Sequence, residues 1–315
     1  MNTSRVVILG AGYTGKELAR IALKNNLEVV GTGRTEESLQ ALRDLGATAV
    51  QWSVGDDPAE WLDHVGPQTT LVYSIPTLFD SYEASEDIAR HVEPLRQIID
   101  VCVEQGGLDR FIYLSSTSVY GDHHGEWVDE ATERRPYSPY GKMRADIEDY
   151  LLERKTSFPI TIARLVGIYG PGRNLINMLV DGRYTLIEGA KKVTNRIHVH
   201  DIARAVLAII ERGHEGNRVF NITDGHPQPS RDLIEFICEE TEIDPPPTET
   251  MEQYRARVHD PNRIARRQSS VRVLNDRLRR ELQFDLVYPD AFAGYKAIID
   301  AGSFTTDRDT APVPG

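Results

Sequence analysis

The stretch that most constrains this fold lies at the N-terminus, where an apolar run leads into three closely spaced glycines. Val6 to Leu9 is followed by Gly10-Ala11-Gly12-Tyr13-Thr14-Gly15 and then by a helical pattern of apolar residues. In such a strand–turn–helix unit, one glycine makes the turn, one lets the backbone approach a pyrophosphate, and one lets the helix pack on the strand. The helix N-terminus adds unpaired N–H groups and a positive dipole end. The sequence therefore predicts a dinucleotide-binding turn with contacts at Gly10, Gly12, Tyr13, Thr14 and Gly15.

Strand and helix patterns then alternate along the chain. Strands are expected at 27–33, 47–52, 70–75, 110–114, 159–164, 196–199 and 218–223, and helices at 36–45, 86–105, 202–212 and 230–241. Alternation of this kind predicts an α/β fold, a doubly wound Rossmann-type parallel sheet.

The last third of the chain departs from this alternation and suggests a second, smaller unit. We expect residues 1–172, with 196–224 returning to them, to form the dinucleotide-binding domain. Residues 173–195 and 225–302 are expected to form a C-terminal α/β substrate-binding region, in which 174–188 looks like a helix plus hairpin. Asp201 is placed to cap the helix at 202–212. The Thr/Asp/Pro-rich tail, 303–315, is expected to be disordered.

Two strand ends carry the residues that would choose and orient the cofactor. No carboxylate follows the second strand until Glu36, whereas Arg34 could meet a 2′-phosphate, so the sequence favours NADP(H) over NAD(H). The alternative is that Arg34 is a solvated loop residue. The fourth strand ends in Ser74, Ile75 and Pro76, which we expect on the nicotinamide side because open α/β sheets bind ligands at the carboxyl ends of their strands.

Hydroxyl groups and a phenol–cation pair point to proton chemistry. The fifth strand delivers Ser115-Ser116-Thr117-Ser118, which suits a site that hydrogen-bonds an alcohol or carbonyl. Tyr140 and Arg144 are four residues apart in a predicted helix and share a face. A phenol beside a fixed cation favours its phenolate form, which prepares it for proton transfer.

Composition excludes several function classes. The net charge of −12 argues against general nucleic-acid affinity. No apolar run approaches the roughly 20 residues needed to span a membrane, and no signal peptide is visible. The two cysteines are expected to be buried free thiols in a reducing cytoplasm. No metal-ligand cluster is found, so no metal is expected.

One basic stretch stands out in this acidic chain. Residues 252–281 hold nine arginines and four acids. Some of these arginines could contact an anionic substrate such as a diphosphate. Alternatively, they form a solvated helix face or a subunit contact, for example in a homodimer. The arginines are Arg255, Arg257, Arg263, Arg266, Arg267, Arg272, Arg277, Arg279 and Arg280.

Several motifs in order resemble the extended short-chain dehydrogenase/reductase superfamily, in its NAD-dependent epimerase/dehydratase group. The resemblance covers roughly residues 5–300. It rests on the glycine turn, Ser-Ser-Thr-Ser-Val-Tyr-Gly, Ser-Pro-Tyr-Gly, Arg-Leu-Val-Gly-Ile-Tyr-Gly-Pro-Gly, and Ile-His-Val-His-Asp-Ile-Ala-Arg-Ala. The resemblance implies that Ser116 holds the substrate oxygen and that Tyr140 is the acid/base.

The chain departs from the family pattern at three points. Arg144 stands where the family lysine would bind the nicotinamide ribose and assist the tyrosine, Leu9 replaces the first glycine of the usual GxxGxxG, and no Asp-Glu pair follows Ser116. The first two resemble the atypical branch, and the third argues against a nucleotide-sugar 4,6-dehydratase.

Two functions stay open on these grounds. One is an NAD(P)-dependent oxidoreductase or epimerase that moves a hydride between nicotinamide and a carbonyl or secondary alcohol, with a nucleotide-sugar among the candidate substrates. The other is an NADP-binding regulatory or sensor protein without turnover.

Overall fold

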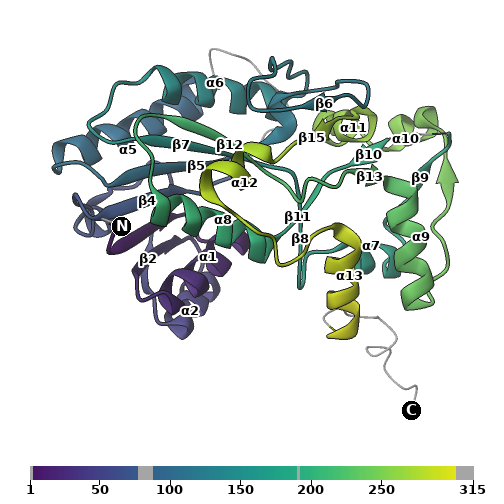
Figure 1. Cartoon of the computed structure of the whole chain (residues 1–315), viewed down its shortest axis with the longest axis horizontal. Helices are drawn as coiled ribbons and strands as arrows, with labels where there is room; N and C mark the ends of the chain where they lie inside the picture. The colour runs from purple at the N-terminus through teal and green to yellow at the C-terminus, as the bar shows by residue number, and fades with distance from the viewer. Residues whose placement is uncertain (1–2, 77–87, 190–191, 303–315) are drawn as a thin grey trace.

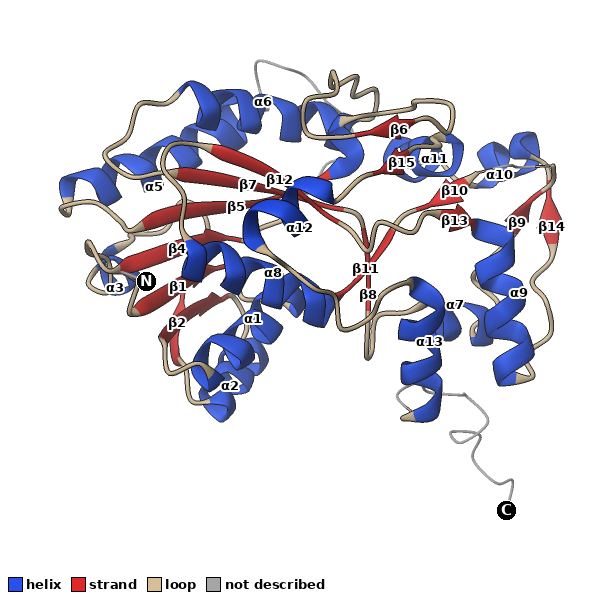
Figure 2. Ribbon diagram, in the orientation of Figure 1, coloured by secondary structure: helices blue, strands red, loops and turns tan. Residues whose placement is uncertain are grey.

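Seven parallel strands form one sheet at the centre of the larger part of the molecule (Figure 2). The computed structural model describes residues 3–76, 88–189 and 192–302. The strands of this sheet are β1 (Arg5–Leu9), β2 (Glu28–Gly33), β3 (Thr48–Gln51), β4 (Thr69–Tyr73), β5 (Arg110–Ser116), β7 (Ile160–Leu165) and β12 (Arg218–Ile222). The predicted doubly wound Rossmann-type fold is confirmed.

The order of the strands places the predicted contacts at one edge of the sheet. The order is β12-β7-β5-β4-β1-β2-β3, so the chain reverses its direction of travel between β1 and β4. Ligands of open α/β sheets bind outside the carboxyl ends of the strands at such a switch point. The glycine turn after β1, Ser74 after β4 and Ser116 at the end of β5 all lie at this edge.

Alternating side chains along each strand fill two core layers. Val6 and Ile8 point to one face and Val7 and Leu9 to the other, as the period of two in a strand requires. Figure 1 shows the helices on both faces. One layer is covered by α1 (Tyr13–Lys24), α2 (Glu36–Leu45), α8 (Val199–Arg212) and α12 (Asp276–Leu282), and the other by α3 (Ala59–Leu62), α5 (Glu93–Glu104) and α6 (Pro139–Glu153).

A third core lies under the C-terminal elements. Tyr169, Tyr295 and buried residues of three helices form it, and the rings of Tyr169 and Tyr295 stack with centroids 4.8 Å apart. The helices are α7 (Leu175–Val180), α9 (Ser230–Thr241) and α13 (Ala291–Asp300). The remaining helices of this part are α10 (Met251–Arg257) and α11 (Pro261–Gln268).

Short two-stranded pairs connect this part to the rest of the chain. They join β8 (Gly167–Tyr169) to β11 (Arg196–His198), β9 (Leu186–Ile187) to β14 (Thr248–Glu249), β10 (Val193–Thr194) to β13 (Gln228–Pro229), and β6 (Trp127–Val128) to β15 (Arg272–Val273).

Three local predictions differ from the structure. The helix expected at 86–105 begins outside the described residues, and its described part is a π-helical turn, η1 (Ile88–Val92), followed by α5. The regular α-helix begins beside Pro94, because proline has no N–H to donate and is tolerated in the first turn of a helix. The hairpin expected within 174–188 is wrong, because β9 pairs with the distant β14.

Asp201 is not the cap that we predicted. The helix starts earlier, at Val199, and the His198 side chain accepts a hydrogen bond from the His200 N–H. Asp201 is fully buried, and its carboxylate accepts bonds from the N–H groups of Val287 and Tyr288 at 2.9 Å. It therefore ties α8 to the segment that precedes α13.

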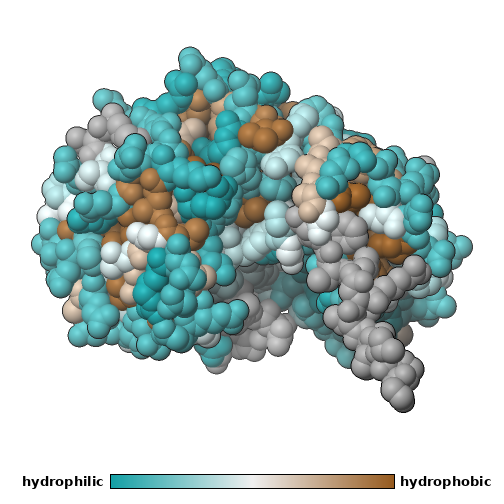
Figure 3. Space-filling view, turned by 90° about the horizontal axis from the view of Figure 1, so that it is seen from below, coloured by the Kyte–Doolittle hydropathy of each residue, from teal (hydrophilic) through white to brown (hydrophobic). Residues whose placement is uncertain are grey.

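Figure 3 shows a largely hydrophilic face on which hydrophobic residues form separate patches.

Cys102 and Cys238 are buried free thiols, as expected. Among the described residues, none of the helices has the length and apolar character needed to cross a membrane. The tail expected to be disordered, 303–315, lies outside the described residues.

Candidate functional site

A cavity of about 1410 Å³ opens at the carboxyl edge of the sheet. It runs from the glycine turn to the C-terminal elements, so residues far apart in the sequence share it. All but one of the predicted site residues line it: Gly10, Gly12, Tyr13, Thr14, Arg34, Ser74, Ile75, Pro76, Ser116, Tyr140 and Arg144. Gly15 does not.

The glycine turn has the shape of a cradle for a phosphate group. Gly10 has a φ of +81°, and a Cβ there would lie 2.7 Å from Cγ1 of Ile75, so only glycine fits. A Cβ on Gly12 would meet nothing within 4 Å, so Gly12 faces open space. Gly15 instead lets α1 pack closely on β1, because a Cβ there would lie 3.1 Å from the Ile8 side chain.

The first N–H groups of α1 have no side-chain cap and could therefore bind a ligand. Gly12 caps the helix without a side-chain hydrogen bond, and its first turn holds no acid. Such a terminus attracts an anion through its N–H groups and dipole. The Tyr13 hydroxyl donates to the Pro171 carbonyl at 3.0 Å, and the Arg173 guanidinium lies 5.7 Å from the Tyr13 ring centre. Tyr13 thereby holds a cation, Arg173, beside the turn.

Arg34 lies on the exposed rim of the cavity beyond β2. It lines the cavity together with Thr35 and Ser38. The nearest carboxylate in the sequence, Glu36, does not line the cavity and pairs with Arg43. The rim of the cavity beyond β2 is therefore basic.

The four hydroxyl residues at the end of β5 and just beyond it make different contacts. Ser115 donates to the buried Glu148 carboxylate at 2.6 Å, and Thr117 donates to the Leu165 carbonyl at 3.4 Å. Ser116 accepts a hydrogen bond from the Ser118 N–H at 3.2 Å, and no bond donated by its hydroxyl is found among the described residues. Ser116 can therefore donate that proton to an oxygen in the cavity.

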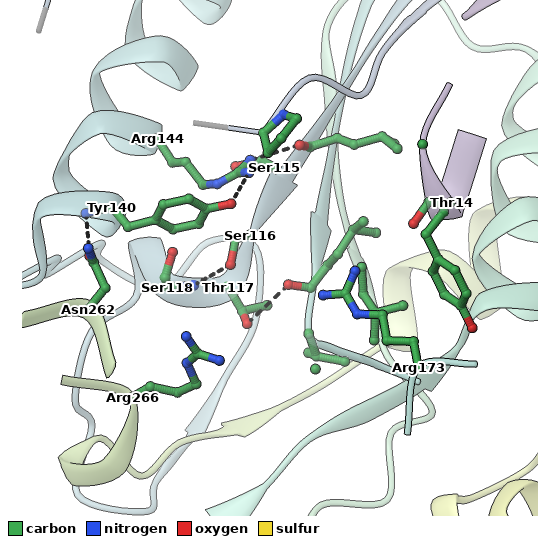
Figure 4. A pocket seen from close by; sticks show the side chains of 18 of the residues that line it. Thr14, Ser115, Ser116, Thr117, Ser118, Tyr140, Arg144, Arg173, Asn262 and Arg266 are labelled. Atoms are coloured by element: carbon green, nitrogen blue, oxygen red, sulfur yellow. Dashed lines mark hydrogen bonds between the residues drawn. The ribbon is translucent and has the colours of Figure 1, made fainter. Parts of the chain in front are cut away.

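Tyr140 and Arg144 meet as their spacing predicts. The Arg144 guanidinium donates to the Tyr140 hydroxyl at 2.5 Å and to the Leu114 carbonyl at 2.8 Å. Figure 4 shows this pair on the same side of the cavity as Ser116, with Thr14 and Arg173 on the other side. Burial alone would lower the pKa of Arg144, but the adjacent Tyr113 and Tyr140 raise it, so the guanidinium stays charged.

Contacts at the start of α6 hold Tyr140 in place. Ser138 caps the helix by accepting from the Gly141 N–H at 3.0 Å. A Cβ on Gly141 would lie 2.6 Å from the Ser118 carbonyl, so glycine lets α6 approach the turn that follows β5 closely. Asn262 of α11 accepts from the Tyr140 N–H at 2.8 Å, and the Tyr137 hydroxyl donates to the Ala265 carbonyl at 2.7 Å. The C-terminal helix α11 is thus attached to the helix that carries the phenol.

Among the described residues, the charged side chains that line the cavity are all basic. Three arginines of the basic stretch face it, and no Asp or Glu does. Other arginines of that stretch pair with carboxylates instead: Arg257 pairs with Glu249, and Arg277 lies 3.6 Å from Glu130. The basic residues of the lining are Arg34, Arg90, Arg144, Arg173, Lys192, Arg196, Arg263, Arg266 and Arg267.

Sequence reasoning missed Arg173 and Arg196, and it did not decide which arginines of the basic stretch would line the cavity. Arg173 directly follows the Gly-Pro-Gly run, and Arg196 begins the Arg-Ile-His-Val run, so both lay within or beside quoted motifs. Arg263, Arg266 and Arg267 stand at i, i+3 and i+4, which marks one helix face. Only the tertiary structure shows that this face meets the cavity. No cluster of three or more potential metal ligands exists within the described ranges.

Solved structures share this fold over nearly the whole chain. A functionally unknown conserved protein from Silicibacter pomeroyi is 31% identical, with a TM-score of 0.80 over 95% of this chain and 99% of that one. MoeE5, solved with UDP-glucose and NAD, is 19% identical with a TM-score of 0.74, covering 98% and 100%. Human SDR39U1, solved with NADPH, is 13% identical with a TM-score of 0.74, covering 94% and 99%. The last two show likeness of fold alone.

Sequence comparison agrees with the architecture. Protein YeeZ of Escherichia coli is 26% identical over 231 residues, which cover 71% of this chain and 79% of YeeZ. The model of the NAD-dependent epimerase/dehydratase family matches residues 6–223. This match spans the glycine turn, Ser116 and the Tyr140–Arg144 pair. The chain therefore belongs to the NAD-dependent epimerase/dehydratase family.

Proposed function

We propose that this protein is an NADP(H)-dependent oxidoreductase or epimerase that acts on a carbonyl or secondary alcohol of an anionic small molecule. The observation that carries this proposal is a single cavity lined by the glycine turn, the Ser116 hydroxyl and the Tyr140–Arg144 pair. Nucleotide-sugars are one candidate class, since MoeE5 was solved with UDP-glucose and NAD.

The residues present fit a nicotinamide dinucleotide. Gly10, Gly12 and the first turn of α1 would hold the pyrophosphate, and Arg34 would contact the 2′-phosphate that distinguishes NADP(H) from NAD(H). Ser74, Ile75 and Pro76 would line the nicotinamide side. When bound, the cofactor supplies or accepts the hydride. NAD(H) remains the alternative cofactor, because relatives of this fold have been solved with either.

The protein's own residues would position the substrate and move the proton. Ser116 donates a hydrogen bond to the substrate oxygen, and Tyr140 gives or takes the proton at that oxygen. The positively charged Arg144 guanidinium donates a hydrogen bond to the Tyr140 phenol oxygen and so stabilises the phenolate form. No carboxylate of the described residues lines the cavity, so a hydride transfer suits this site better than an elimination that needs a further acid and base.

Titration of the purified protein with NADPH and with NADH tests this function directly. We expect NADPH to bind more tightly, and a screen of carbonyl substrates should show loss of absorbance of the reduced cofactor. The proposal is wrong if neither dinucleotide binds.

The second candidate function is a regulatory or sensor protein that binds NADP(H) without turnover. The observation that favours it is Arg144, which cannot give up its proton as the family lysine can. Arg144→Lys separates the two candidates. Activity that appears only in this variant supports the sensor, whereas turnover by the wild type supports the enzyme.

A further inference from the structure

Four basic side chains gather in the part of the cavity formed by the C-terminal elements. They are Lys192, just before β10, Arg196 at the start of β11, and Arg266 and Arg267 on α11. We call them the basic cluster. Figure 4 places Arg266 on the side of Ser118 and Tyr140, opposite Thr14 and Arg173. Arg266 of the basic cluster therefore lies on the side of the reacting groups, across the cavity from Thr14 of the glycine turn.

The local structure explains why these charges come together. Asp260 caps α11, and the helix is attached to α6 through Asn262 and Ala265, which turns the face with Arg263, Arg266 and Arg267 toward the cavity. The Lys192 ammonium donates to the Arg266 carbonyl, which ties the segment before β10 to the same helix. The cluster is thus built from three separate segments and held by hydrogen bonds.

Nothing in the described residues neutralises the basic cluster. None of its four members pairs with a carboxylate at ion-pair distance, and Nε of Arg196 is buried without a hydrogen-bond partner. The Arg267 guanidinium lies over the rings of Tyr184 and Tyr254, at 4.6 and 5.3 Å. Like charges held close together repel one another, so an anion bound there would relieve that repulsion.

Four carboxylates of the described residues act electrostatically on the basic cluster, and each has partners elsewhere. Asp224 acts on Arg196 and accepts from the His226 N–H, while Glu249 acts on Arg267 and pairs with Arg257. Asp260 accepts bonds from the N–H groups of Asn262 and Arg263, and Asp122 accepts from those of Ser270 and His124. Asp122 raises the pKa of Lys192 only slightly against larger opposing effects. Burial, followed by the charges of Arg267, Arg196 and Arg266, lowers that pKa to about 7. Near neutral pH the amine therefore loses part of its charge when no anion is bound.

We propose that the basic cluster binds a doubly charged phosphoryl group of the substrate and that Lys192 takes up a proton when this group binds. Three guanidinium groups and one ammonium match the several oxygens and the double charge of a phosphoryl group better than a singly charged carboxylate. The proton comes from solvent and converts the amine to an ammonium. This proposal deepens the proposed function, because it names the substrate class for the same cavity.

Sulfate is the probe, because it stays doubly charged across the whole pH range of the experiment. The protein is first saturated with NADP⁺ to fill the cofactor end. Calorimetric titration with sulfate at pH 8, in two buffers of different ionisation enthalpy, then gives the affinity and the number of protons taken up. We expect uptake of about one proton at pH 8 and almost none at pH 6. Acetate should bind at least about tenfold more weakly than sulfate.

Three variants test the named residues. Lys192→Met and Arg267→Ala should each weaken sulfate binding about tenfold. Lys192→Arg should keep binding and lose the proton uptake, since arginine stays charged. Arg280→Ala is the matched control, because Arg280 belongs to the same basic stretch, is exposed and does not line the cavity. Unchanged binding in both weakening variants, equal affinity for acetate, or undiminished uptake in Lys192→Arg would overturn the proposal.

The outcome is separable from that of the proposed function. If no dinucleotide binds, the same titration is made on the protein alone, with Arg34→Ala as the reference variant. Sulfate binding that depends on Lys192 and Arg267 but not on Arg34 would then support the basic cluster while the proposed function fails.

Discussion

Gly10 and Gly12 are two residues apart and are needed for different reasons. Gly10 has a backbone conformation and a close neighbour that exclude a side chain, whereas Gly12 has a φ of −75° and open space beside it. A side chain at Gly10 would therefore disturb the fold, and one at Gly12 would disturb only what occupies the cavity.

Gly12→Val is expected to abolish dinucleotide binding and leave the protein folded. Its side chain would fill the space that the pyrophosphate needs, and the affinity for NADPH should fall at least about a hundredfold. Gly10→Ala is the matched comparison and should lower the free energy of unfolding by about 1–3 kcal/mol. Binding titrations and thermal melts of both variants check this. Wild-type NADPH affinity in Gly12→Val would defeat the assignment of the turn.

Local spacing decided which site residues could be predicted. The turn and the Tyr140–Arg144 pair are set by residues at most five positions apart, so the sequence displayed them directly. Lys192 and Arg196 reach the cavity only through strands that pair with distant partners. Periodicity along one segment contains no information about such pairings, which is also why the hairpin expected within 174–188 was wrong.

At the scale of elements, the contact between α11 and α6 positions Tyr140. The first N–H groups of a helix have no partner within the helix, and Asn262 satisfies that of Tyr140 from a different element. The basic face of α11 and the phenol on α6 therefore share one anchoring point.

Removal of this anchor is expected to affect stability and turnover together. Asn262→Ala should lower the free energy of unfolding by about 1 kcal/mol, because a helix N-terminal N–H loses its acceptor. Asn262→Asp keeps an acceptor oxygen and should stay close to the wild type. Denaturant unfolding, with kcat for any substrate found, checks both variants. Equal stability of Asn262→Ala and Asn262→Asp would contradict this role.

A buried ionic network fixes the ends of the central strands. Glu148 of α6 is fully buried, accepts from Ser115 of β5, and forms an ion pair with Arg164 of β7 at 2.7 Å. Arg164 also donates to the Tyr120 hydroxyl at 2.9 Å, and Tyr120 donates to Asn221 of β12 at 2.7 Å. Four elements beneath the cavity are thus held by one set of hydrogen bonds.

Glu148→Ala is expected to be strongly destabilising. It leaves the Arg164 guanidinium buried and without its charge partner, which should cost about 3–5 kcal/mol of unfolding free energy. The control is Asp149→Ala, which removes a half-exposed carboxylate that pairs with Arg134 and should cost about 1 kcal/mol or less. Urea denaturation of both variants measures the difference. A small loss in Glu148→Ala would show that the network adds little to stability.

At the scale of the whole molecule, Asp224 lies where the central sheet meets the C-terminal core. It follows β12, is 2% exposed, and accepts from the His226 N–H at 2.9 Å through one carboxylate oxygen. The other oxygen is buried without a hydrogen-bond partner among the described residues. Burial, with a smaller contribution from Asp290, raises the pKa of Asp224 to about 7, against the opposing effects of the His226 N–H and the Arg196 charge.

This carboxyl is expected to make the folded state less stable as the pH rises. Between pH 3.8, where the carboxyl of the unfolded chain ionises, and about pH 7, the folded protein holds one more proton than the unfolded chain, so its stability falls by up to about 1.4 kcal/mol per pH unit. Asp224→Asn should remove this slope and be more stable than the wild type at pH 8. The difference between the two proteins must be measured at each pH, because burial lowers the pKa of His198 and His214 to about 4 and gives the opposite slope in the same range. Parallel stability curves for wild type and Asp224→Asn from pH 5 to pH 8 would show that Asp224 is ionised in the folded protein and that the junction tolerates a buried charge.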